Sequence, residues 1–271
     1  MALTSHLLAA GAGWRVCDVV CTAGPHDRPF EERHEGVCVA VVTEGTFRYR
    51  STHGSAMLAP GALLLGNDRH CFECGHEHGV GDRCLSFRFA PEFLEGVAAE
   101  IPGARQIGFA VPRLPPHPTL LPLLAAAQAA RDGGEEAAFE EVALRLAGTV
   151  CAALTTTVER QRAPTRRDEG RIAVALRLIA AHADEPLSLA ELAAAAAMSR
   201  YHFLRTFRTV VGMTPHQYIL HTRLLRAAAR LRRTREAISA IAFAAGFNDL
   251  STFNRRFARI IGQSPSAYRV R

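Results

Sequence analysis

The chain has 271 residues and the composition of a soluble globular protein, enough for two domains that each bury a core. It contains no run of the ~18 apolar residues that a membrane-spanning helix needs, and its N-terminal stretch lacks the basic start of a secretion signal. Residues 165–271 hold 18 arginines against 7 acidic residues, a net charge of +11, whereas residues 1–164 carry −5. We therefore expect a cytoplasmic protein whose C-terminal part meets a polyanion.

The N-terminal part is expected to form short strands from about Arg15 to Phe89, where β-branched and aromatic runs are broken by Gly and Pro. The segment TEGTF, residues 43–47, is typical of a hairpin turn, and APGALLL, residues 59–65, of a turn that enters a buried strand. Strands at this spacing predict a small sandwich or barrel. Residues 90–118 give a mixed, proline-rich signal.

One segment of this part, RHCFECGHEHGVGDRCLSF, is rich in thiols and imidazoles. On an extended strand Cys74, His76 and His78 would share one face, and the turn GVGD would return Cys84 beside them. Three interpretations stay open: a zinc site, a low-pKa thiol that senses oxidants, and side chains that only pack. We assign no metal ligand and no cofactor, and the seven cysteines are expected to be reduced.

Helical periodicity begins after Pro118, in two segments that Gly133 and Gly134 separate. We expect residues 119–161 to be a helical segment. Residues 162–170, RAPTRRDEG, are polar and aperiodic, which predicts a linker. Everything that follows, residues 171–271, is expected to be helical.

The last hundred residues contain the same pattern twice. MSRYHFLRTFRTVVGMTPHQY, residues 198–218, repeats as GFNDLSTFNRRFARIIGQSPSAY, residues 246–268, with one extra residue in the second turn. In each copy a short helix, a tight turn and a second helix follow one another, and that second helix has two phenylalanines at i and i+4 for its buried face. Ser188 and Glu191 form a capping box at the first start. Two helix-turn-helix motifs joined by a long helix are predicted.

Residues 172–271 resemble the DNA-binding domain of the AraC family of transcription regulators in both copies. The resemblance implies that the second helix of each motif reads bases in successive segments of the major groove. The implied base-reading residues are Arg200, Tyr201, Leu204, Arg205, Ser251, Thr252, Asn254 and Arg255. Arg208, Arg223 and Arg226 are expected to contact phosphates.

The strand-rich half resembles the cupin-like sensor domain of many such regulators, so we expect an α+β chain. Its expected domains are a sensor at residues 1–118, the helical segment at residues 119–161, the linker and the DNA-binding domain. The resemblance implies that the helical segment serves dimerisation and coupling. The implied function is sequence-specific DNA binding in response to an unidentified small-molecule or redox effector, without catalysis. RNA polymerase and a second copy of the chain are further expected partners. The alternative is a cupin-type metalloenzyme with a helical tail.

Overall fold

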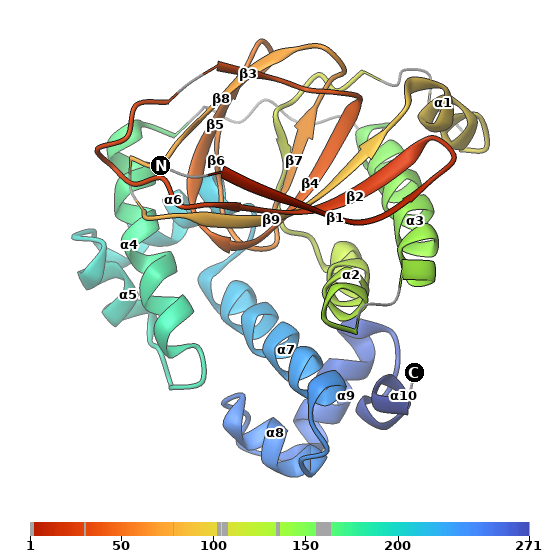
Figure 1. Cartoon of the computed structure of the whole chain (residues 1–271). Coiled ribbons are helices and arrows are strands. Elements are labelled where there is room, and N and C mark those ends of the chain that lie inside the picture. The colour runs from red at the N-terminus through yellow and green to blue at the C-terminus, as the bar shows by residue number, and fades with distance from the viewer. Residues whose placement is uncertain are drawn as a thin grey trace. The chain divides into compact units, whose positions relative to one another are not determined.

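The computed structural model describes residues 3–29, 31–77, 79–101, 104, 108–133, 136–155 and 164–270. They form two compact units. The first comprises residues 1–116 and 135–163 and is built on β-strands; the second comprises residues 117–134 and 164–271 and is helical (Figure 1). The expected α+β class is confirmed, because a strand-rich N-terminal region precedes a helical C-terminal domain.

The first unit is a pair of antiparallel sheets facing one another. The larger sheet has the order β1-β2-β9-β4-β7-β10 and the smaller one the order β3-β8-β5-β6. The strands are β1 (Leu3–Gly11), β2 (Trp14–Cys21), β3 (Glu31–Arg33), β4 (Val37–Gly45), β5 (Phe47–Ser51), β6 (Gly54–Leu58), β7 (Leu63–Gly66), β8 (Cys71–Gly75), β9 (Asp82–Phe89) and β10 (Arg113–Leu114). This agrees with the sandwich or barrel that the spacing of turn residues predicts.

The hydrophobic core of this unit lies between the two sheets. Strand β4 contributes Ala40 and Val42, and β5 contributes Phe47 and Tyr49, all buried in one cluster. The fully buried β7 confirms that APGALLL leads into a core strand. Continuous apolar runs such as VCVAVV in β4 are expected for strands covered on both faces.

The segment TEGTF is not the hairpin turn that its composition predicts. Strand β4 pairs with β7 and β9 in one sheet, whereas β5 pairs with β6 and β8 in the other. The chain therefore crosses between sheets here. Gly45 makes this possible with φ at +75° and a backbone so close to Gly81 that a Cβ would lie 2.2 Å from its carbonyl oxygen.

Two helices complete the first unit. Helix α1 (Pro91–Ala99), with proline in its first turn, occupies part of the segment whose proline-rich sequence gave only a mixed signal. It packs against α3 (Glu136–Thr155), which also contacts β1. Phe139 of α3 places its ring 6.4 Å from that of Phe87 of β9, so α3 closes the outer side of the larger sheet.

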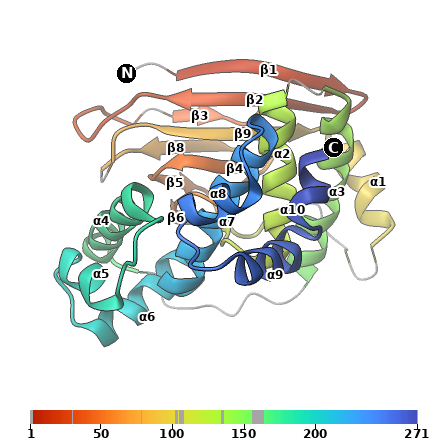
Figure 2. The same cartoon turned by 90° about the horizontal axis from the view of Figure 1, so that it is seen from below.

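The second unit consists of a short 3-10 turn and eight α-helices within the described residues. They are η1 (Pro118–Leu120), α2 (Leu121–Gly133), α4 (Arg166–His182), α5 (Leu189–Ala195), α6 (Arg200–Val211), α7 (Pro215–Arg233), α8 (Ile238–Ala244), α9 (Leu250–Ile261) and α10 (Pro265–Val270). Helix α7 runs between the group α4–α6 and the group that contains α9 and α10, as both views show (Figures 1 and 2). None of the helices described is long and apolar enough to cross a membrane.

The two helices of the expected coupling segment belong to different units. Helix α2 belongs to the helical unit, where it packs on α7 and α9, whereas α3 belongs to the unit of sheets. The role of both helices in dimerisation stays a prediction.

The expected linker is shorter than its composition indicates. Helix α4 begins at Arg166, inside the predicted segment 162–170, because Thr165 accepts a hydrogen bond from the backbone N–H of Asp168 and caps the helix. Residues 156–163 lie outside the described part of the chain.

Candidate functional site

The first repeat folds as α5, a turn and α6. Ser188 and Glu191 form the predicted capping box, with Ser188 Oγ accepting from the Glu191 backbone at 3.1 Å and the carboxylate accepting from the Ser188 backbone at 2.7 Å. Hydrogen bonds from the side chain and the backbone of Ser188 to the carboxylate lower the pKa of Glu191. Ser199 caps α6 by accepting from the backbone of His202 at 3.4 Å, as the sequence predicts.

Helix α6 has one buried face and one exposed face. Phe203 and Phe207 are fully buried with ring centroids 5.5 Å apart, which confirms their predicted place in the core. Leu204, Arg205 and Arg208 are exposed. Arg200 and Tyr201 form the first turn of α6, but their side chains lie outside the description.

The second repeat folds as α8, a turn and α9. The carboxylate of Asp249 caps α9 by accepting from the backbone of Thr252 at 2.7 Å, and this bond lowers the pKa of Asp249. The sequence argument missed this cap. Along α9, Phe253 and Phe257 are fully buried.

The opposite face of α9 presents the remaining predicted base-reading residues. Ser251, Asn254 and Arg255 are exposed, and Thr252 is half-buried. Arg205 of α6 and Arg255 of α9 thus occupy equivalent exposed positions, each two residues after the first buried phenylalanine of its helix. Guanidinium groups at such positions can donate two hydrogen bonds to a guanine edge.

The two turns have the same backbone hydrogen bonds. Met198 donates to the carbonyl of Ala193 in the first, and Phe247 donates to that of Ala242 in the second. The left-handed residue in these turns is Ala197, with φ at 50°, and Gly246, with φ at 84°. The first turn spans residues 196–199 and the second residues 245–249, which confirms that the second is one residue longer.

Helix α7 joins the motifs, and two of its arginines donate hydrogen bonds to backbone carbonyls. Arg223 donates from Nε to the carbonyl of Ala183 at 2.5 Å, from Nη1 to that of Gly246 at 2.6 Å and from Nη2 to that of Glu185 at 2.8 Å. Arg226 donates to the carbonyl of Ala180. All three nitrogens of the half-buried Arg223 donate to carbonyls, which corrects its expected phosphate contact to a structural role. Arg226 is exposed and has one such bond, so its phosphate contact stays a prediction.

The unit of sheets contains a cavity of about 130 Å³. It opens between the two sheets, and its lining is mainly apolar, with side chains such as Phe47 and Phe72. Its polar lining comprises Ser5, Cys21, Glu32, His34, Cys38, Cys74, His76, Asp82, Cys84, Ser86 and Arg88. Four of the seven cysteines therefore line one space.

The predicted cluster of Cys74, His76, His78 and Cys84 does not lie on two paired strands of one sheet. Cys74 lies on β8 and His76 just beyond the end of that strand, while Cys84 lies on β9 of the other sheet. Strands β8 and β9 therefore lie in different sheets instead of forming a hairpin. His78 lies outside the described residues.

The thiols of this cavity are not the low-pKa thiols that oxidant sensing would need. Burial raises the pKa of Cys74 and Cys84 well above the usual value, and the nearby carboxylate of Asp82 raises it further. Protonated thiols react slowly with oxidants. The sequence argument also missed Cys21 and Asp82, because their proximity depends on strand register.

Comparison with known proteins identifies the helical unit. A family model described as a helix-turn-helix domain matches residues 192–271. The regulatory protein SoxS of Salmonella typhimurium is 40% identical over 90 residues, which cover 33% of this chain and 84% of SoxS. The chain belongs to the AraC family of transcription regulators. The residues that match the family model, 192–271, lie in the unit that carries the two motifs.

Two further matches also cover only part of this chain. The MmsAB operon regulatory protein of Pseudomonas aeruginosa is 34% identical over 90 residues, which are 33% of this chain and 29% of that protein. A solved transcriptional regulator from Chromobacterium violaceum, described as containing an AraC-type DNA-binding domain, is 28% identical and has a TM-score of 0.37. The alignment covers 39% of this chain and 95% of that structure.

Proposed function

We propose that this AraC-family chain is a sequence-specific DNA-binding transcription regulator whose activity responds to a signal received by the unit of sheets. The observation that carries the proposal is the repeated geometry of the two motifs, with Arg205 and Arg255 exposed at equivalent positions. In DNA, α6 and α9 enter successive segments of the major groove, about 34 Å apart along one face of the duplex.

The remaining exposed residues of both helices divide into two roles. Arg200, Tyr201, Leu204, Ser251, Thr252 and Asn254 approach base edges together with Arg205 and Arg255. Asn254 suits adenine, which pairs with an amide through two hydrogen bonds, and Leu204 suits the methyl group of thymine. Arg208 contacts a phosphate and so contributes affinity and register instead of sequence preference.

The two units of the chain have different roles in this proposal. The cavity between the sheets of the cupin-like unit accepts a small effector, and RNA polymerase and a second copy of the chain are further partners. Such a regulator acts in the cytoplasm. The net charge of +11 on residues 165–271 supports a polyanion as the partner of the helical unit.

The proposal is tested by selecting binding sites from random duplex DNA with the purified full-length chain. We expect one enriched sequence with two elements about one helical turn apart. Affinity for it should fall steeply with salt, since each phosphate neutralised by an arginine releases counterions. The control is the double variant Arg205→Ala, Arg255→Ala, which should lose the preference but keep salt-dependent binding to random DNA.

Two results would contradict this function. A folded chain that enriches no sequence, or that binds DNA independently of salt, is not a sequence-specific regulator of this kind. Turnover of a small molecule in the absence of DNA would favour the metalloenzyme alternative instead.

A further inference from the structure

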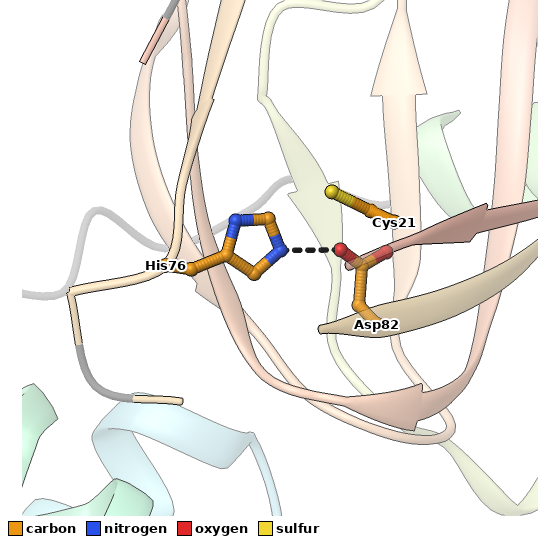
Figure 3. Close-up of side chains that lie close together, drawn as sticks. All are labelled: Cys21, His76 and Asp82. Carbon is orange, nitrogen blue, oxygen red and sulfur yellow. Dashed lines mark hydrogen bonds and ion pairs between the residues drawn. The ribbon is translucent and has the colours of Figure 1, made fainter. Parts of the chain in front are cut away.

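Three metal-ligand side chains from distant parts of the sequence meet at the rim of the cavity. The Sγ atom of Cys21, a ring nitrogen of His76 and a carboxylate oxygen of Asp82 all lie within 4.8 Å of one another. Figure 3 shows the three side chains directed toward one space, Cys21 and Asp82 from one side and His76 from the other. His76 and Asp82 are almost fully buried, with side-chain exposures of 2% and 8%, while Cys21 is half-buried.

Strand register fixes this arrangement. Cys21 ends β2 and Asp82 begins β9, and the two residues are directly opposite one another in the larger sheet. Directly opposed residues have Cβ atoms about 4.5–5.5 Å apart. His76 follows β8 of the smaller sheet, and its Nε2 lies 2.5 Å from Oδ2 of Asp82. The three groups therefore link the two sheets at one end of the cavity.

We propose that Cys21, His76 and Asp82 form a binding site for Zn²⁺. A thiolate, an imidazole and a carboxylate are all zinc ligands, and the thiolate disfavours the hard cations Mg²⁺ and Ca²⁺. The charges also balance, because one thiolate and one carboxylate neutralise a divalent cation in a largely buried place. A buried charge otherwise requires such compensation.

The arrangement needs only small changes to accept the ion. Zinc at about 2.0–2.3 Å from each ligand atom requires ligand atoms roughly 3–4 Å apart. Rotation of the half-buried Cys21 side chain adjusts its Sγ, and the His76 and Asp82 side chains, now 2.5 Å apart, must separate slightly. Zinc takes the place of the proton between His76 Nε2 and Asp82, the imidazole then carries its proton on Nδ1, and the thiol of Cys21 gives its proton to solvent. Cys84 donates a hydrogen bond from Sγ to Oδ1 of Asp82 at 3.5 Å, so it orients the carboxylate without binding the ion.

This ligand set leaves one tetrahedral position for a non-protein donor. All three side chains line the cavity, so that position is next to its interior. Zinc sites with three protein ligands keep their fourth position for water or for another small ligand. The inferred site thus gives the cavity a Lewis-acidic end that would prefer ligands with a nitrogen, oxygen or sulfur donor.

The experiment is metal binding by the full-length chain after treatment with a chelator and a thiol reductant. We expect one equivalent of Zn²⁺ per chain in a competition titration, unaffected by excess Mg²⁺. Co²⁺ should give a cobalt–thiolate charge-transfer absorption that Zn²⁺ removes. Because the Cys21 thiol must lose its proton, uptake should release about one proton per zinc and strengthen with rising pH.

Variants identify the ligands. Cys21→Ser should abolish the cobalt–thiolate absorption, and Asp82→Asn should weaken zinc binding at least about tenfold, since even outer partners of zinc ligands contribute about 10- to 100-fold. Cys151→Ser is the matched control, because Cys151 is a buried thiol on α3 outside the cavity lining. Circular dichroism establishes that each variant is folded; if Cys21→Ser is not, Asp82→Asn and His76→Gln decide the question.

The inference is wrong if the reduced chain binds no stoichiometric zinc. It is also wrong if Cys74→Ser removes the cobalt–thiolate absorption while a folded Cys21→Ser variant retains it. The result does not depend on DNA, so it leaves the proposed regulatory function to its own test.

Discussion

The guanidinium of Arg223 on α7 donates a 2.6 Å hydrogen bond to the carbonyl oxygen of Gly246, in the turn of the second motif. The same side chain donates to the carbonyls of Ala183 and Glu185 at the end of α4 and in the loop after it. One side chain thus fixes the second turn against a loop that leads into the first motif.

Replacing Arg223 by lysine should disrupt this connection, because an ammonium group cannot reproduce the planar fork of a guanidinium. We expect a loss of about 2–4 kcal/mol of unfolding free energy, since hydrogen bonds from charged donors contribute about 1.5–3 kcal/mol each. Urea unfolding of the full chain measures it. Arg208→Lys is the control, because Arg208 is exposed; equal stability of both variants would contradict the structural role.

Arg205→Ala and Arg255→Ala should each weaken binding to the selected DNA site by about 1–3 kcal/mol and relax preference at one or two base pairs. Arg208→Ala should instead weaken selected and random DNA by the same factor. Titrations with both DNAs at constant salt distinguish the two roles. A uniform loss for Arg205→Ala would show that this residue contacts only the backbone.

Phe257→Ala should destabilise the second motif by about 3–5 kcal/mol through a core cavity. Phe257 is fully buried, with its ring 5.4 Å from that of Phe253 and 5.6 Å from that of Tyr268. Phe243→Ala is the matched control, because Phe243 is 53% exposed and should change stability by about 0.5 kcal/mol or less. Thermal unfolding of both variants is the measurement.

The two turns predict opposite effects for reciprocal substitutions. Ala197→Gly should stabilise the chain by about 1 kcal/mol, because a left-handed backbone strains every residue with a Cβ. Gly246→Ala should destabilise it by more than about 1–2 kcal/mol, because the new Cβ would lie 2.3 Å from the carbonyl oxygen of Asp184. Destabilisation by Ala197→Gly would show that its positive φ is not retained in solution.

Buried His34 should make the stability of the unit of sheets depend on pH. Burial lowers its pKa to about 4, and its Nε2 lies 2.8 Å from the hydroxyl of Tyr49. In the unfolded chain the pKa of His34 is near 6.5, so the unfolded state binds the proton first as the pH falls. The contribution of neutral His34 to the free energy of unfolding is therefore complete above about pH 6.5 and is lost as the pH falls toward 4. The loss should be of order 3 kcal/mol. His34→Gln should flatten the curve in urea unfolding between pH 7 and 4; an unchanged slope would exclude His34 as its source.

The helical unit was largely predictable because its information is local. The positions of Ser188, Ser199 and the paired phenylalanines follow from capping and from helical periodicity, and the structure confirms them. The role of Arg223 was not predictable, since its three acceptors are backbone carbonyls brought together only by packing. A basic residue on a helix next to a DNA-binding motif gives the same sequence signal whether it binds a phosphate or a carbonyl.

The unit of sheets was less predictable because strand pairing is non-local. A small sandwich or barrel of several short strands follows from the turn residues, but TEGTF has the composition of a hairpin and crosses between sheets instead. The thiol cluster shows the same limit: Cys74 and Cys84 are close in sequence and lie on opposite sheets. Cys21 and Asp82 are sixty-one positions apart in the sequence and lie directly opposite one another on adjacent strands.

Helix α2 gives the chain an unusual order of assembly during synthesis. The hydroxyl of Tyr268 donates to the carbonyl of Ala125 across 143 residues of sequence, and Ala125 belongs to the core that Phe253 and Phe257 fill. At about 5–20 residues per second, a ribosome needs roughly 7–30 s to synthesise the intervening chain. Through that interval α2 has emerged without the helices that bury its apolar face, so the second motif completes its core only after Tyr268 has been synthesised.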